Sequence, residues 1–247
     1  MFKYILLGVV QGITEFLPVS SSGHLVILQR VFGLSGEEIA ISIVLHLGTL
    51  IAVVIFFFKE ILKVMRDKRS IFLIVLVTFI TGIIGILGKD FFESLFSSPR
   101  AVILPFLITG VVLLLTRNFN HSKDVKVGLK DALILGFTQA IAILPGISRS
   151  GITISTLLFR KIEKEVCFKF SFLVSIPLIL GATLLEMRKV GSALLENPIN
   201  LAGGFIASVI SGLLALFVLK LIIKRAKFYY FGYYCILVAL LTLIFIK

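Results

Sequence analysis

Six apolar runs, each long enough to cross a bilayer, restrict what this chain can fold into. A helix needs about 20 apolar residues to cross a membrane. The runs lie near residues 39–58, 70–88, 100–117, 166–187, 199–222 and 228–246. Hydrophobic residues make up 58% of the 247 residues and charged residues only 15%, a balance that is far from that of soluble domains. The sequence therefore predicts an all-α polytopic membrane protein with six transmembrane helices.

Two further apolar regions, residues 3–33 and 130–160, are each interrupted in the middle by a polar loop. Each half contains about 14 residues, which at ~1.5 Å per residue reach about 21 Å. This length is less than the ~30 Å of hydrocarbon in a bilayer. We therefore expect two re-entrant helical hairpins, whose exposed backbone must be surrounded by protein or by a water-filled cavity.

The two interrupted regions resemble each other at a nearly constant offset of 127 to 128 residues. The matching segments are Gly8-Val-Val-Gln11 with Gly136-Phe-Thr-Gln139, Leu17-Pro18 with Leu144-Pro145, and Ser22-Gly23 with Ser150-Gly151. A hairpin returns to its own side and three spans change side, so the second unit enters from the opposite face. We predict one integral membrane domain over 1–247, built from inverted-topology repeats 1–117 and 130–247 with a site near the midplane.

The basic residues indicate the orientation of this domain. With Arg149 set aside, the face that carries the N-terminus holds seven Lys and Arg residues and the opposite face holds seventeen. The positive-inside rule places the second face in the cytoplasm. Both termini and the mouth of the first hairpin are therefore expected outside. Cytoplasmic loops beside anionic lipid also explain the net charge of +12 without a nucleic-acid partner.

The polar loop of the first hairpin carries candidate catalytic groups. Gln11 and Glu15 are four residues apart and share one helix face, and Pro18 ends that helix. Ser21 is a candidate nucleophile, and His24 is a candidate base because an imidazole titrates near neutral pH. The alternative is ordinary loop chemistry, since Ser and Gly are common in turns.

Arg149 is the chemical centre of the second hairpin. An ionised guanidinium near the bilayer midplane costs several kcal/mol unless it is paired or hydrated, so it indicates a functional site. Its planar fork suits a phosphate or a carboxylate. Gly146, Ser148 and Ser150 would direct backbone N–H groups and hydroxyls toward the same anion. The alternative is a structural ion pair between Arg149 and Glu15 that locks the hairpins together.

These motifs resemble those of the undecaprenyl-diphosphate phosphatase family, the bacitracin-resistance phosphatases of bacterial membranes. The resemblance is carried by Gln11-Gly-Ile-Thr-Glu-Phe-Leu-Pro-Val-Ser-Ser-Ser-Gly-His24 and Pro145-Gly-Ile-Ser-Arg-Ser-Gly151, and segments 45–54 and 170–177 extend it over nearly the whole chain. It implies hydrolysis of undecaprenyl diphosphate to undecaprenyl phosphate and inorganic phosphate. The reaction would take place at the outer face of the bacterial cytoplasmic (inner) membrane and recycle the lipid carrier of peptidoglycan synthesis.

The resemblance also implies roles for individual residues. Ser21 would be the nucleophile, with Ser22 as a neighbouring hydroxyl, and Arg149 would bind phosphate. Glu15 would orient His24, act as a base or hold Mg²⁺ or Ca²⁺, and the sequence does not choose among these roles. Attack by metal-activated water, with Ser21 only binding phosphate, also stays open. Gln11 replaces a second carboxylate, so a cation at Glu15 and Gln11 would need phosphate oxygens to complete its shell.

Three further features are interpreted as structural. His46 stands where Gln is expected in the family, and we expect it to be a hydrogen-bonded core histidine. Cys167 and Cys235 have no metal-ligand spacing and are expected to be free thiols. The tyrosine cluster is expected to anchor the last span at the cytoplasmic interface; its members are Tyr229, Tyr230, Tyr233 and Tyr234.

The rival function is a secondary transporter or a polyprenyl-phosphate flippase, because inverted repeats and broken helices are common in transporters. A transporter would not turn over a diphosphate, whereas a nucleophile and a base beside an arginine favour an enzyme. The partners expected for a phosphatase are a polyprenyl diphosphate and membrane lipids, and a homodimer is compatible with the sequence.

Overall fold

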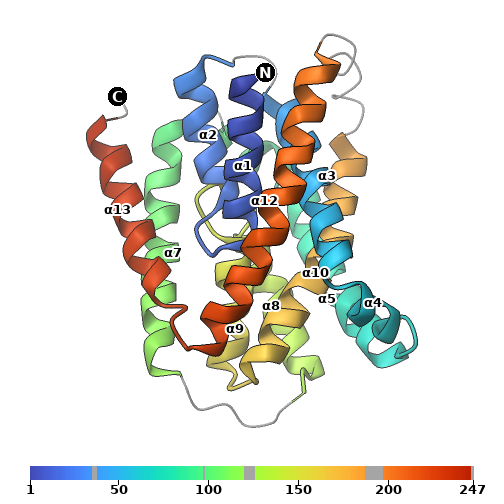
Figure 1. Cartoon of the computed structure of the whole chain (residues 1–247). Coiled ribbons are helices and arrows are strands. Elements are labelled where there is room, and N and C mark those ends of the chain that lie inside the picture. The colour runs from blue at the N-terminus through green and yellow to red at the C-terminus, as the bar shows by residue number, and fades with distance from the viewer. Residues whose placement is uncertain (35–37, 97, 120–125, 187–196, 246–247) are drawn as a thin grey trace.

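The computed structural model describes residues 1–34, 38–96, 98–119, 126–186 and 197–245, which form helices and turns. The first half contains α1 (Phe2–Phe16), α2 (Ser21–Phe32), α3 (Glu38–Phe56), α4 (Phe58–Val64), α5 (Lys68–Leu87), α6 (Lys89–Phe96), η1 (Pro99–Val102), α7 (Ile103–Leu115) and η2 (Thr116–Asn118). The second half contains α8 (Leu129–Ile141), α9 (Arg149–Phe159), α10 (Lys164–Glu186), α12 (Pro198–Lys224) and α13 (Tyr230–Phe245). The start of α1 and the end of α13 lie at the same end of the helix bundle (Figure 1).

The described residues contain four to five helical segments that are long and apolar enough to cross a membrane. Four are single stretches: Lys68–Leu87, Pro99–Asn118, Lys164–Leu185 and Pro198–Lys224. The fifth candidate is α3 together with α4, which are bent by 76° at their junction. The predicted run 228–246 forms α13, which has only 16 residues because the chain turns at Phe228 and Tyr229 before the helix begins. Exposed side chains such as Phe79 on α5 and Phe217 on α12 suit contact with lipid.

Both predicted polar breaks are present, and the helices after them begin in the same way. α1 ends at Phe16, just before Pro18, and α8 ends at Ile141. Ser20 caps α2 by accepting a hydrogen bond from the backbone N–H of Gly23 at 3.3 Å. Ser148 caps α9 by accepting one from Gly151 at 3.1 Å. These side-chain caps satisfy N–H groups that a helix start leaves free.

Within each broken helix pair, a hydrogen bond also connects the start of the first helix to the end of the second. The two contacts lie at matching positions of the repeats. Lys3 Nζ donates to the backbone oxygen of Phe32 at 2.8 Å, which connects the start of α1 to the end of α2. Arg160 Nε donates to Asp131 Oδ1 at 2.7 Å, which connects α8 to the end of α9. We refer to these two contacts as the mouth contacts.

Each pair of short helices packs against a long helix from the other half of the chain. α1 lies along α12, and α8 lies along α5. The Ser211 hydroxyl of α12 donates to the backbone oxygen of Gly8 at 3.4 Å. On the other side, the Thr81 hydroxyl of α5 donates to the backbone oxygen of Gly136 at 3.0 Å. The position of the first pair therefore depends on residues about 200 positions further along the chain.

We predict that Gly8→Ala lowers the stability of the protein, because a Cβ at this position would overlap the backbone oxygen of Gly204 and lie 2.9 Å from its carbonyl carbon. Overpacking of this kind costs about 1–3 kcal/mol. Gly82→Ala in α5 is the matched control, since its Cβ would meet no atom within 4 Å. We expect the control to be neutral or stabilising by up to about 1 kcal/mol. Thermal unfolding in detergent measures both changes, and equal melting temperatures for the two variants would contradict the close approach of α1 and α12.

Candidate active site

The loop between α1 and α2 meets the loop between α8 and α9 inside the bundle (Figure 1). The backbone N–H of Gly146 donates to the Ser20 hydroxyl at 3.1 Å, and the Ser150 hydroxyl donates to the Leu17 backbone oxygen at 3.3 Å. Thr109 of α7 supports the second loop, because its hydroxyl donates to the Gly146 backbone oxygen and accepts from the Ser148 N–H, both at 3.1 Å. The two loops are therefore joined directly.

Two residues of these loops hold unusual backbone conformations. Gly146 has φ of 97°, and a Cβ there would lie 2.6 Å from the Val102 backbone oxygen. Ser20 has φ of 66°, a backbone conformation that residues other than Gly adopt at a cost of about 1–3 kcal/mol. Such strain persists only where surrounding contacts fix the backbone, and it is common at functional sites.

Glu15 is the centre of the candidate site. Its Oε1 accepts from Arg149 Nη2 at 2.6 Å, so the ion pair considered from the sequence is present. Its Oε2 accepts from the Ser21 hydroxyl at 2.6 Å and from Gln11 Nε2 at 3.2 Å. The residue is only 8% exposed. One buried carboxylate thus connects the candidate nucleophile to the candidate phosphate-binding arginine.

This arrangement uses only part of the hydrogen-bonding capacity of the Arg149 guanidinium. Its Nη2 is bound to Glu15, and its guanidinium carbon lies 5.7 Å from the centre of the Phe172 ring. Its Nη1 is buried and has no hydrogen-bond partner among the described residues. A buried charged donor without a partner is costly. The free arm is therefore available to an anion while the other arm stays on Glu15.

Both ring nitrogens of His24 have partners other than the Ser21 hydroxyl, so the structure shows no direct hydrogen bond between the expected nucleophile and base. The Nδ1 atom of His24 is 2.7 Å from the Ser20 backbone oxygen, and Nε2 is 2.8 Å from the Tyr234 hydroxyl. The reason is that Ser21 turns toward Glu15 on α1 whereas His24, almost one helical turn later, turns toward α13. Of the roles left open for Glu15, the geometry favours that of base for Ser21 over orientation of His24.

His46 belongs to the site rather than to the apolar core. Its Nε2 lies 3.5 Å from Glu15 Oε2, and its Nδ1 is 2.7 Å from the Ser42 backbone oxygen. The interpretation of His46 as a structural core histidine was therefore incomplete. The signal that could have found it is its departure from the Gln expected in the family, within a segment that carries the resemblance.

The remaining predicted phosphate ligands lie at the loop junction, where they also hold the fold. The Ser22 hydroxyl is 3.3 Å from that of Ser20, and the Ser148 and Ser150 hydroxyls are 3.2 Å apart. Ser148 and Ser150 are almost completely buried and already bond to the backbone. Their first role in this arrangement is to fix the loops, and Gly146 contributes its backbone N–H to the same junction.

The predicted metal ligands offer a partial fit to a divalent cation. Gln11 Oε1 is buried without a partner among the described residues, so it is an available neutral oxygen ligand. Both oxygens of Glu15 already accept hydrogen bonds. The described part of the chain contains no cluster of three His, Cys, Asp or Glu side chains suited to a metal. Gln11 and Glu15 would therefore supply two ligands and the substrate and water the others.

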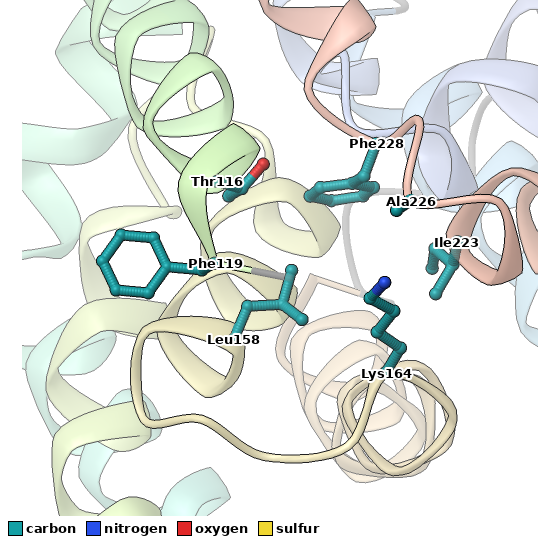
Figure 2. Close-up of a pocket in the computed structure, with 7 residues that line it drawn as sticks. All are labelled: Thr116, Phe119, Leu158, Lys164, Ile223, Ala226 and Phe228. Atoms are coloured by element: carbon teal, nitrogen blue, oxygen red, sulfur yellow. The ribbon is translucent and has the colours of Figure 1, made fainter. Parts of the chain in front are cut away.

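A small pocket lies elsewhere, where α7, α9, α10 and α12 approach one another at their ends (Figure 2). Its volume is about 10 Å³, roughly the space of one water molecule. The lining residues are Thr116, Phe119, Leu158, Lys164, Ile223, Ala226 and Phe228. None of the predicted site residues lines this pocket, so it is separate from the Glu15 cluster.

The fold and the site define a polytopic helical membrane protein with a buried cluster of Glu15, Ser21 and Arg149 at the junction of two broken helix pairs. Residues 4–241 match the family model described as "Bacitracin resistance protein BacA", and the chain belongs to this family. The family suggested by the sequence motifs is thereby confirmed.

Similar curated proteins cover nearly the whole chain. An undecaprenyl-diphosphatase of Carboxydothermus hydrogenoformans is 42% identical over an alignment of 245 residues that covers 94% of this chain and 92% of the relative. One of Thermotoga maritima is 41% identical over 242 residues, covering 96% and 98%. One of Methanococcus maripaludis is 40% identical over 252 residues, covering 98% and 99%.

We predict that His46→Gln keeps most of the turnover number of the protein and that His46→Leu lowers the turnover number about tenfold. The amide of Gln can still donate to Glu15 Oε2, whereas Leu removes a polar neighbour from a buried carboxylate. The turnover number of the two variants, measured side by side, checks this expectation. Equal losses for Gln and Leu would indicate that His46 acts as an imidazole in its own right.

Proposed function

We propose that this protein hydrolyses undecaprenyl diphosphate to undecaprenyl phosphate and inorganic phosphate and thereby recycles the lipid carrier of cell-wall synthesis. The observation that carries the proposal is the buried series of hydrogen bonds from Ser21 to Glu15 and from Arg149 to Glu15. In this arrangement Nη1 of Arg149 stays free for a phosphate. The names of the relatives give the substrate. The proposal also includes the bacitracin resistance named in the family description.

The proposed chemistry begins at Ser21. Its hydroxyl donates to Glu15 at 2.6 Å, so the carboxylate can take the proton while Ser21 Oγ attacks the terminal phosphorus. The P–O bond to undecaprenyl phosphate breaks, and water then releases inorganic phosphate from the phosphoserine. Arg149 neutralises charge on the transferred phosphoryl group, which is the largest requirement of such a reaction. His24 exchanges a proton with the substrate or with the attacking water.

A divalent cation, Mg²⁺ or Ca²⁺, is part of the proposal. Gln11 Oε1 and Glu15 would hold it together with diphosphate oxygens, and it would supply further charge neutralisation. The serine and arginine steps above do not depend on it.

We further propose six spans and two re-entrant hairpins in an inverted repeat within a single domain. The matching caps at Ser20 and Ser148, the mouth contacts and the exchanged packing of α1 on α12 and α8 on α5 support this arrangement. The site would open to the outside of the cytoplasmic membrane, with both termini on that side. A homodimer is compatible with this arrangement.

Phosphate release from undecaprenyl diphosphate by the purified protein tests the function. A secondary transporter or flippase would bind the lipid phosphate without releasing inorganic phosphate. Trapping of labelled phosphoserine at Ser21 distinguishes covalent catalysis from direct attack by water.

We predict that Arg149→Lys lowers the turnover number by at least about tenfold. A lysine can still pair with Glu15, but it has no second planar arm for phosphate. Arg160→Lys is the matched control, because Arg160 also pairs with a carboxylate, that of Asp131, at a mouth contact. We expect the control to keep nearly full activity in the phosphate-release assay. Wild-type rates for Arg149→Lys would remove the free arm from the mechanism.

Gln11→Glu should lower the metal concentration needed for half-maximal activity if Glu15 holds the cation. A second carboxylate one helical turn away strengthens an oxygen-ligand site. If Glu15 serves only as a base, the new negative charge instead makes ionisation harder and moves the acid limb of the pH profile upward. Titrations of Mg²⁺ and Ca²⁺ at several pH values separate the two, and an unchanged metal requirement would rule out the ligand role.

The orientation can be tested by cysteine labelling, because Cys167 and Cys235 are buried and give little background. Ser35 and Ser122, the first sites suggested by the charge distribution, lie outside the described residues. Ser94 on α6 and Lys68 at the start of α5 are exposed and lie on opposite predicted faces. We expect an impermeant thiol reagent to label Ser94→Cys in intact cells and Lys68→Cys only after the membrane is opened. The reverse pattern would place the active loop in the cytoplasm.

A further inference from the structure

The side chain of His24 is held at both ring nitrogens. Nδ1 is 2.7 Å from the Ser20 backbone oxygen, and Nε2 is 2.8 Å from the Tyr234 hydroxyl. A carbonyl oxygen can only accept a hydrogen bond, so Nδ1 must carry the proton. In the neutral ring Nε2 then bears the lone pair, and the Tyr234 hydroxyl donates to it.

The ring is also fixed by its aromatic neighbours. The His24 and Tyr234 rings are nearly parallel, with an interplanar angle of 8° and centroids 5.7 Å apart. Phe106 meets the imidazole edge to face at 5.4 Å. These contacts come from α2, α13 and α7, three elements far apart in the sequence. The orientation of His24 is therefore determined by tertiary structure and not by the loop alone.

Tyr234 differs from the other members of the tyrosine cluster. Tyr230 lies 4.4 Å from Tyr229 and 6.5 Å from Tyr233, measured between ring centroids. Tyr229 and Tyr230 are stacked and Tyr233 is tilted against Tyr230, so these three rings contact one another, as suits an interfacial anchor. Tyr234 turns instead toward His24, and the residue remains 42% exposed.

We propose that Tyr234 is a positioning residue for the phosphatase reaction, acting through His24. The Ser20 carbonyl sets the tautomer in which Nε2 is the proton acceptor, and Tyr234 aims that nitrogen by donating a hydrogen bond to it. The Ser20 carbonyl belongs to the backbone that starts α2, so Nδ1 stays occupied. The phenol is a side chain on another helix and can turn aside, so Nε2 is the nitrogen that exchanges a proton with substrate or water. The inference rests on the proposed function, because it assigns Tyr234 to that reaction.

The test compares Tyr234→Phe with Tyr233→Phe in the purified full chain, using undecaprenyl diphosphate as substrate. Tyr234→Phe keeps the ring and removes only the hydroxyl. We expect its kcat to fall about tenfold, less than the roughly 10²–10⁴-fold contribution of a general acid or base, without a rise in KM. Tyr233→Phe, the same substitution on an exposed neighbour, should leave both constants unchanged. A full kcat for Tyr234→Phe would overturn the proposal.

The double variant gives a second criterion. In a His24→Ala background, Tyr234→Phe should cause no further loss, because residues that act as one unit are not additive. Independent, multiplying losses would show that Tyr234 acts elsewhere and would overturn the proposal.

A spectroscopic readout separates this inference from the proposed function. The chain has only three histidines, so ¹⁵N-histidine labelling with His24→Ala for assignment isolates the His24 signals. Tyr234→Phe should shift the Nε2 signal and leave Nδ1 protonated, and an unmoved signal would contradict the contact. Absence of phosphate release by the wild-type protein would instead refute the phosphatase function, and with it the role of Tyr234 in that reaction.

Discussion

The buried ion pair between Glu15 and Arg149 is the interaction on which the rest of this structure depends. Two charges at 2.6 Å inside an apolar bundle are tolerable only because each neutralises the other and further donors surround the carboxylate. Removing one partner of such a pair costs about 3–5 kcal/mol, since an uncompensated charge stays buried. The pair therefore joins the two broken helix pairs and at the same time assembles the candidate site. The structural interpretation of Arg149 concerns Nη2, which pairs with Glu15, and the functional interpretation concerns Nη1, which is free to bind an anion.

The sequence predicted the parts of the fold that follow from local physical chemistry. Pro18 cannot continue a helix, and the break appears where α1 ends. The internal match of Ser22-Gly23 with Ser150-Gly151 lies at two helix starts that have the same side-chain cap, from Ser20 and from Ser148. The span count was less predictable, because a run of apolar residues does not reveal a 76° bend between α3 and α4 or a turn before α13.

The site was predictable only where one motif supplied the whole contact. Gln11, Glu15 and Ser21 lie within eleven residues of one another, and their connection could be proposed from spacing. His24 hydrogen-bonds to Ser20 and Tyr234 rather than to Ser21, because spacing along a loop does not fix the direction of a side chain. Tyr234 could not be found at all, since 210 residues separate it from His24. Contacts of this kind come from the packing of α13 and leave no local pattern.

The exchanged packing of the two halves has a consequence for biosynthesis. The first hairpin leaves the ribosome long before its partners, because Arg149 follows Glu15 by 134 residues and Ser211 follows Gly8 by 203. Until then Glu15 lacks Arg149, and α1 lacks α12. The nascent chain must keep this carboxylate protonated, hydrated or outside the hydrocarbon until Arg149 is inserted. The site can therefore assemble only after the second half begins to be made, and a truncated first half would carry a carboxylate without its arginine partner.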